Sequence, residues 1–330
     1  MTKVALVDRH GAFLSAKEGR FQLYVKGEKI WDAAPVELDA IVFTISGASI
    51  SAAAIKLAND FGIDLVFMDG NRPVARLIQA RYGSTLKTWL YQLRKAYSKE
   101  ERLKLARAFA EGKIHNQKVT LYEYYKYFKA SGKRYHHLAS ALSYLDKLLM
   151  ELSKASTISE VMGVEALAAR RYWEAVATLL PSDVSFKQRV TKSRQLPGVV
   201  LDIFYKALNI GYGVLRRAVW RAIFIAGLNP YISFLHKPRA GKMTLVFDLM
   251  EEFRPIAVDR PLIAAFRKSL KPFKKLQQDD REAVREVWRT VVNRMYESKP
   301  PLHNAILEQA RLLAKHLRGT DTYKPFKAKW

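Results

Sequence analysis

The hydrophobic pattern changes once along the chain, close to Tyr82, and this change constrains the fold more than any other feature. Before that point, apolar residues alternate or form short runs between turns, as in KVALVD, RFQLYVKGEKI and LDAIVFTIS. Beyond it, they recur at intervals of three and four over long segments. Alternation is typical of half-buried strands, and the longer interval is typical of helices. The sequence therefore predicts an α+β fold, with a β-rich domain at residues 1–80 and a larger all-α domain at 81–330.

One segment inside the β-rich part has the pattern of a helix. This segment, SISAAAIKLANDFG, closes on Gly62, and glycine suits the left-handed conformation that ends many helices. The next segment, IDLVFMDGNRPVARLI, predicts a hairpin with its turn at residues 69–71. We therefore expect a sheet covered by a single helix.

Two helices of the second part begin with a recognisable capping box. Ser98 and Glu101 have the required spacing, as do Thr157 and Glu160. The periodicity predicts further helices over residues 135–153, 199–226, 256–297 and 302–318, a loop over 182–198, and a loosely held basic segment, TYKPFKAKW, over 322–330.

Charge narrows the choice of partner. The 330 residues include 56 Lys and Arg against 31 Asp and Glu, which gives a formal net charge of +25. Each phosphate that a cationic side chain neutralises releases counterions and adds affinity. Nucleic acid is therefore the favoured partner, with an acidic membrane surface, a ribosome or solubility alone as alternatives.

Two absences from the sequence exclude other classes of protein. There is no cysteine, which rules out disulfides, thiolate metal sites and thiol nucleophiles. No apolar run reaches the roughly 18 residues that a membrane span needs. We expect a cytoplasmic protein with no membrane partner, whose metal ligands, if it has any, are His, Asp or Glu.

The stretch HKPRAGKMTLVFDLMEEFRP, which begins at His236, gathers a histidine and three acids in a basic chain. One interpretation is structural: Asp248 caps a helix, Glu251 completes a capping box, and the imidazole is simply buried. The other is functional. In this interpretation His236 and a carboxylate among Asp248, Glu251 and Glu252 bind a divalent metal. A hairpin at RAGK and a strand ending in Phe247 would return the first helical turn to the side of His236.

Mixed imidazole and carboxylate ligation would suit Mg²⁺ or Mn²⁺, with water in the positions that a phosphate oxygen can take. Such a site needs a third protein ligand from elsewhere. The best candidate is Glu165 in GVEALAARRYW, the one acid on a helix face of small apolar residues. The alternative is that Glu165 pairs with Arg170 or Arg171 across one turn, a common surface arrangement.

Several segments together resemble the CRISPR-associated integrase family, the metal-dependent DNA endonucleases of spacer acquisition. GVEALAARRYW, KALNIGYGVLRRAVWRAIFIAGLNPYISFLH and GKMTLVFDLMEEFRPIAVDR look like its successive motifs, and AFAEGKIHNQKVTL looks like the segment ahead of its catalytic glutamate. VDRHGAFLSAKEGRFQLYV extends the likeness to the N-terminal half. The resemblance covers nearly the whole chain, and the family's two-domain fold agrees with the periodicity.

The resemblance implies a role for each candidate acid and for the histidine. Glu165, His236 and Glu251 match the family's catalytic metal ligands, which hold Mg²⁺ or Mn²⁺. Asp248 matches an acid beside the site that orients a ligand or serves as an alternate one. Ser233 stands where the family pattern has Gly, a departure that concerns the local turn.

Other residues are candidates for contact with DNA. The resemblance implies this role for Tyr212, an aromatic residue near the DNA-facing side of the site. Basic residues near the proposed ligands can contact the phosphate backbone or remain solvated charges: Lys237, Arg239, Lys242 and Arg171. The run RKSLKPFKK at 267–275 predicts part of a phosphate track or, more simply, an exposed helix end.

The activity implied by the resemblance is phosphoryl transfer. The 3′-hydroxyl of a short double-stranded DNA fragment would attack a phosphodiester at the border of a repeat in the CRISPR array. The family also implies a homodimer formed through the β-rich domain and a small companion adaptation protein. The alternatives are a structure-selective nuclease for branched DNA repair intermediates and a non-catalytic, basic DNA-binding scaffold.

Overall fold

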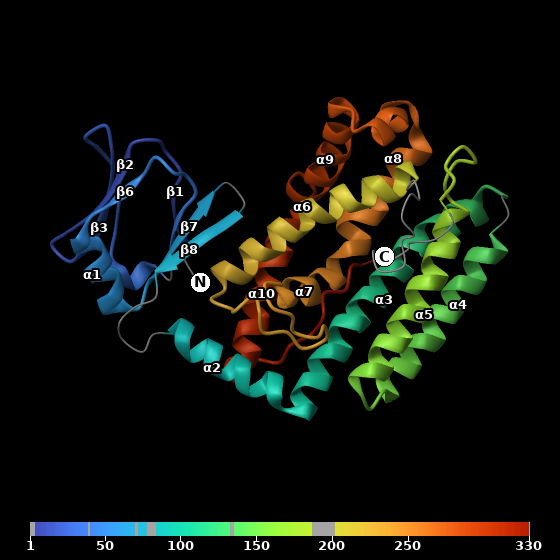
Figure 1. The fold of residues 1–330 in the computed structure, drawn as a ribbon, viewed down its shortest axis with the longest axis horizontal. Helices are drawn as coiled ribbons and strands as arrows, with labels where there is room; N and C mark the ends of the chain where they lie inside the picture. Colours follow the sequence, from blue (N-terminus) through green and yellow to red (C-terminus); the bar gives the residue numbers. More distant parts are fainter. Residues whose placement is uncertain are drawn as a thin grey trace.

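The computed structural model describes residues 4–38, 40–69, 72–77, 84–132, 135–186 and 202–329. Figure 1 shows β-sheets at one end of the molecule and helices in the remainder. Among the described residues, the last strand ends at Leu77 and the long helices begin at Ser84. The α+β fold class is confirmed, while the expected boundary between residues 80 and 81 lies outside the described residues.

The β-rich part contains two four-stranded sheets, where we expected one. The first has the order β1 (Val4–Val7), β5 (Ala40–Phe43), β7 (Asp64–Asp69) and β8 (Arg72–Leu77), with only the last pair antiparallel. The second has the order β4 (Glu28–Ala33), β3 (Arg20–Val25), β2 (Ala12–Lys17) and β6 (Ser49–Ile50). The predicted hairpin is confirmed as β7 and β8, although residues 70 and 71 of its turn lie outside the described residues.

The burial of β5 explains this layering. All four of its residues are buried, as is typical of a parallel strand covered on both faces. Ile41 and Phe43 belong to a core shared with the second sheet and the helix α1 (Ala52–Phe61), whereas Val42 clusters with Phe224 on the opposite face. The first sheet is therefore a middle layer between the second sheet and the helical part.

The helix predicted in the β-rich part is α1, and its ends follow the expected rules. The Ser51 hydroxyl accepts a hydrogen bond from the N–H of Ala54 at its start. Gly62 ends it with φ 67°, in the left-handed region.

Helices account for most of the remaining chain. They are α2 (Ser84–Tyr97), α3 (Lys99–Ala130), α4 (His136–Lys154), α5 (Ile158–Ala177), α6 (Ile203–Ile225), α7 (Thr244–Arg254), α8 (Arg260–Lys268), α9 (Arg281–Tyr296) and α10 (Leu302–Arg318). The N-caps are Ser98 for α3 and Thr157 for α5, as predicted, and each accepts the N–H of the glutamate three residues later. The 32-residue α3 packs against α4, α5 and α7. Within the described parts of the chain, no helix is long and apolar enough to cross a membrane.

The single helix predicted over 256–297 is wrong. The chain forms a π-helical turn at Pro255–Asp259, then α8, then a 3₁₀ segment at Lys271–Gln278, and finally α9. Pro261 and Pro272 lack the N–H that a continuous helix needs, and Asp279 takes a left-handed φ of 56°. Of the predicted loop at 182–198, residues 182–186 are described and contain neither helix nor strand.

Candidate functional site

The loop between α6 and α7 carries His236 and is fixed by two earlier helices. From α2, the Gln92 side-chain amide donates a hydrogen bond to the carbonyl of Ile232 at 2.8 Å. From α3, Arg102 Nε donates to the carbonyl of Phe234 at 2.9 Å. These bonds satisfy backbone groups that a loop inside the protein would otherwise leave unpaired, and they set the position of the histidine.

The predicted strand ending in Phe247 and the helix cap at Asp248 are both wrong. Helix α7 already begins at Thr244, so Asp248 lies one turn inside it. A short run such as TLVF does not reveal by its periodicity whether it forms a strand or a buried helical turn. The functional interpretation required a carboxylate of this segment to lie beside His236, and the helix places Asp248 and Glu251 there.

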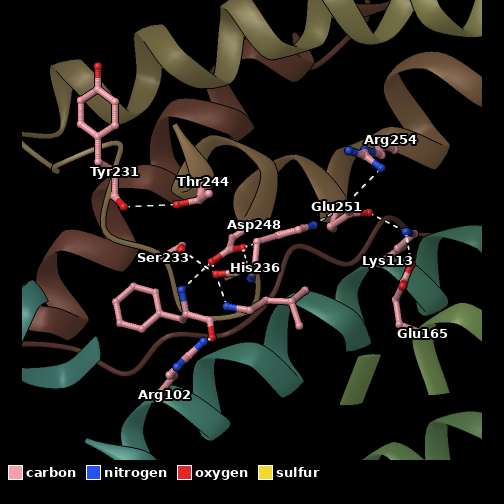
Figure 2. Close-up of polar contacts among 12 residues, drawn as sticks. Arg102, Lys113, Glu165, Tyr231, Ser233, His236, Thr244, Asp248, Glu251 and Arg254 are labelled. Atoms are coloured by element: carbon pink, nitrogen blue, oxygen red, sulfur yellow. Dashed lines mark hydrogen bonds and ion pairs between the residues drawn. The ribbon is translucent and has the colours of Figure 1, made fainter. Parts of the chain in front are cut away.

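Asp248 organises the loop from inside the helix. It is fully buried, and its Oδ2 accepts the N–H groups of Phe234 at 2.7 Å and Leu235 at 3.0 Å. Its Oδ1 accepts the N–H of His236 at 2.9 Å and lies 2.7 Å from that residue's Nδ1 (Figure 2). A buried carboxylate with this many donors is well satisfied. The arrangement favours a proton on Nδ1 and leaves Nε2 free to act as a ligand.

The free face of the imidazole points toward Glu251. Nε2 of His236 lies 4.0 Å from Oε1 of Glu251, which follows Asp248 by three residues on α7. Burial alone lowers the pKa of His236, but its hydrogen bond with Asp248 and the charges of Asp248 and Glu251 outweigh burial and raise that pKa.

Glu251 and Glu165 converge on one cation, the ammonium group of Lys113. Nζ of Lys113 lies 2.6 Å from Oε2 of Glu251 and also pairs with Glu165 of α5 (Figure 2). Arg254 contacts the other oxygen of Glu251 at 3.0 Å. Burial alone would raise the pKa of Glu251, but Arg254, Lys113 and His236 lower it to about 2. Both helices therefore present carboxylates to the same point, and Glu251 stays ionised.

Whether this group could hold a metal depends on the donors and on the space they share. Among the described residues, no three His, Cys, Asp or Glu side chains lie close enough together to bind one ion. Two carboxylates, those of Glu165 and Glu251, nevertheless share the ammonium group of Lys113, and Nε2 of His236 lies 4.0 Å from the other oxygen of Glu251. Oε2 of Glu251 is buried and has no hydrogen-bonding partner beyond its contact with Lys113. This donor set fits Mg²⁺ or Mn²⁺.

Comparison with known proteins places the chain in a family. Residues 5–288 match the family model described as CRISPR associated protein Cas1. The CRISPR-associated endonuclease Cas1 1 of Saccharolobus solfataricus is 40% identical over 327 residues, covering 99% of this chain and 84% of the relative. The chain belongs to the Cas1 family.

Solved structures show the same fold. A casposase bound to an integration product aligns with a TM-score of 0.79 at 21% identity, covering 99% of this Cas1-family chain and all of the other. A partial Cas6-RT-Cas1–Cas2 complex contains a chain with a TM-score of 0.72 at 20% identity, with full coverage of both chains. At these identities the likeness concerns the fold alone.

The basic residues predicted to touch DNA differ in their surroundings. Lys237, Arg239 and Lys242 are exposed on the loop between His236 and α7. Arg171 of α5 pairs with Glu174 of the same helix at 3.3 Å and donates a hydrogen bond to the Ser140 hydroxyl of α4 at 2.9 Å.

Tyr212 lies in the interior of this Cas1-family chain rather than on a surface. Its hydroxyl donates to Asp259 at 2.5 Å, and the guanidinium of Arg254 lies 5.2 Å from its ring centre. Arg254 in turn contacts Glu251. Tyr212 therefore supports the carboxylate cluster, which consists of Glu165 and Glu251, through Arg254. A direct contact with DNA would require it to leave this position.

Ser233, which stands in place of the expected glycine, closes the turn before His236. It is buried, and its hydroxyl donates to the carbonyl of His236 at 2.8 Å. The hydroxyl thus has a hydrogen-bonding partner inside the protein, and the bond stabilises the loop that carries His236.

Sequence reasoning missed the two cations of the cluster, Lys113 and Arg254. Lys113 lies in the segment AFAEGKIHNQKVTL, which was recognised as a motif, but nothing in its spacing pointed to Glu165 of another helix. Arg254 follows Glu251 by three residues, a spacing that could have predicted the pair. The alternative partners considered for Glu165, Arg170 and Arg171, are not the ones it has in the structure.

Proposed function

We propose that the chain is a divalent-metal-dependent DNA endonuclease and integrase of CRISPR adaptation. The observation that carries the proposal is that Glu251 contacts the same lysine ammonium as Glu165 and also lies 4.0 Å from Nε2 of His236, in a Cas1-family fold. In a basic protein, this is where a cation and a DNA phosphate can meet.

Glu165, His236 and Glu251 would hold Mg²⁺ or Mn²⁺. When bound, the ion polarises a phosphate oxygen and stabilises the charge that develops during phosphoryl transfer. Asp248 keeps the imidazole oriented with Nε2 toward the site. Exposed Lys237 and Arg239 attract the DNA backbone to the same face of the protein.

The reaction proposed is a transesterification at a repeat border. The 3′-oxygen of a short DNA fragment forms a new bond to phosphorus, and the bond from phosphorus to the 3′-oxygen of the target strand breaks. The proton lost by the attacking hydroxyl is balanced by the one gained by the leaving oxygen. Hydrolysis of DNA would use the same site with water as the nucleophile.

The assembly proposed is a homodimer, joined through the β-rich domain, that works with a small companion protein. The solved Cas6-RT-Cas1–Cas2 complex supports a companion of the Cas2 type for this family member. Its DNA substrates would be a short duplex fragment and the repeat array.

The experiment is strand transfer of a short duplex with free 3′-hydroxyls into a plasmid carrying a repeat array, in Mn²⁺. We expect Glu165→Gln, His236→Ala and Glu251→Gln each to lower the rate at least about 100-fold with DNA affinity retained. Glu174→Gln, an exposed change on the same helix as Glu165, is the matched control. Wild-type rates in all three variants would refute the metal site, and insertion at random positions would favour a general nuclease.

A further inference from the structure

The segment after α10, residues 319–329, is bound across α3 and α7, contrary to the expectation of a loosely held end. In Figure 1 it is the red trace that runs between these helices to the end marked C. Its side chains alternate: Tyr323 is buried and Lys324 is exposed, and Phe326 is half-buried with Lys327 exposed beside it. We call residues 322–328 the strap.

Glu252 anchors the strap to α7. It is fully buried, and its Oε1 accepts the hydroxyl of Tyr323 at 2.5 Å while its Oε2 accepts the N–H of Phe326 at 2.7 Å. The ring of Phe326 stacks on Phe253 with centroids 4.7 Å apart. Burying a carboxyl group costs desolvation free energy unless it is hydrogen-bonded. Both oxygens of Glu252 accept hydrogen bonds from the strap.

Asn116 joins the strap to both helices at once. Its side-chain amide on α3 donates to the carbonyls of Glu252 at 2.7 Å and Phe326 at 2.9 Å. Its Oδ1 accepts the N–H of Ala328 at 2.8 Å. One side chain therefore links α3, α7 and the strap.

Gly112 permits the close approach of these three elements. A Cβ at this position would lie 2.9 Å from Cγ of Glu252 and 3.0 Å from Cβ of Pro325, closer than a side chain allows. Gly112 directly precedes Lys113, and Glu252 directly follows Glu251. The strap therefore packs against Gly112 and Glu252, the residues adjacent in sequence to Lys113 and Glu251.

We infer that the strap positions the catalytic centre: by binding Glu252 and Asn116 together, it fixes α7 against α3 so that Glu251 faces Glu165. This inference rests on the proposed function, because it assigns the strap a role in that site. Tyr323, Phe326 and Asn116 are positioning residues, since they act on Glu251 through the backbone and do not reach the reacting atoms. A shift of about 1 Å in such a carboxylate can cost about 100-fold in rate.

The test compares full-length Phe326→Ala, its conservative counterpart Phe326→Leu, and wild type. The readouts are kcat and KM for strand transfer, Mn²⁺ affinity by electron paramagnetic resonance, and the melting temperature. We expect Phe326→Ala to lower kcat about tenfold or more and to weaken Mn²⁺ binding several-fold, with KM for DNA unchanged. Phe326→Leu should recover most of both, and Lys324→Ala, on the exposed face of the strap, should keep the wild-type kcat and Mn²⁺ affinity.

A lower melting temperature with wild-type kcat and Mn²⁺ affinity would overturn the inference, because the strap would then only stabilise the fold. If Phe326→Ala does not fold, Tyr323→Phe, which removes one hydroxyl, decides by the same readouts. The two proposals can fail separately. A wild-type protein without Mn²⁺-dependent strand transfer refutes the proposed function, whereas the Mn²⁺ binding comparison still decides the role of the strap.

Discussion

Nζ of Lys113 lies 2.6 Å from Oε2 of Glu251 and pairs at the same time with Glu165, so one lysine joins carboxylates from two helices. Without a cation between them, the two carboxylates would repel each other. Lys113 therefore holds the two carboxylates together, and a metal ion bound as proposed would compete with it for them.

Replacing Lys113 by Met should change stability and metal affinity in opposite directions. Breaking a buried ion pair leaves uncompensated charge, so we expect the metal-free free energy of unfolding to fall by about 3 kcal/mol. Mn²⁺ affinity should rise, because the competing ammonium is gone, and saturating Mn²⁺ should restore much of the lost stability. Urea unfolding with and without Mn²⁺ measures both effects.

The matched control for that experiment is Lys118→Met. Lys118 is on the same helix and pairs with Asp146, whose side chain is 56% exposed. Such pairs contribute at most about 1 kcal/mol, so this variant should unfold near the wild-type urea concentration. Unchanged or weaker Mn²⁺ binding in Lys113→Met would contradict the competition.

Replacing Asp248 should loosen the loop that carries His236. In Asp248→Ala, three backbone N–H groups, two of them buried, and the imidazole lose their acceptor. We therefore expect a loss of about 3 kcal/mol or more in the free energy of unfolding. Asp248→Asn keeps one acceptor oxygen and should lose less. Denaturant titration gives the values, and equal stability of Asp248→Ala and wild type would refute the role assigned to this carboxylate.

Acid should inactivate the protein through His236. The imidazole must be neutral to bind a metal, and its pKa is raised above the ordinary value of about 6.5. Protonation therefore increases as the pH falls through this raised pKa, and strand transfer should decline on the acid side of neutrality. Rates measured from pH 5 to 8.5 at fixed Mn²⁺ test this, and a profile flat down to pH 5 would show that this histidine is not a ligand.

In the run RKSLKPFKK, Arg267 packs against other residues of the protein, whereas the two lysines at its end are exposed. Arg267 donates to the carbonyl of Leu179 and lies over the rings of Tyr124 and Phe128, at 5.2 and 5.1 Å, so it serves packing. Lys274 and Lys275 are exposed. If both contact phosphates, the slope of log affinity against log salt should fall by about 0.9 for each lysine changed to Ala.

Fluorescence anisotropy with duplex DNA at several salt concentrations measures that slope. Lys147→Ala is a suitable control, because this exposed lysine on α4 already pairs with Glu151 at 3.8 Å. Salt slopes for Lys274→Ala and Lys275→Ala that equal the control's would remove these residues from the phosphate track.

The sequence predicted features that depend on local rules. The change of period, the N-caps Ser98 and Thr157, and the end of α1 at Gly62 are set by residues within one or two turns of each other, and the structure shows them as predicted. The proximity of His236 to Glu251 was also predicted, although through a strand that is in fact the first turn of α7.

The features that could not be predicted depend on contacts between distant segments. Lys113 reaches Glu165 across 52 positions in sequence, and Glu252 receives the strap from more than 70 residues away. No spacing rule links such residues, because their proximity follows from how α3, α5 and α7 pack. Charge alone made TYKPFKAKW look like a loose end, whereas Tyr323 and Phe326 bind it to the interior.

The most direct test of the account is a crystal soaked in Mn²⁺ and measured at the manganese absorption edge. We predict one anomalous peak bounded by Glu165, Nε2 of His236 and Glu251, with the ammonium of Lys113 displaced from the Glu251 oxygen. Lys113 still bridging the two carboxylates at saturating Mn²⁺, with no anomalous peak between them, would contradict the account.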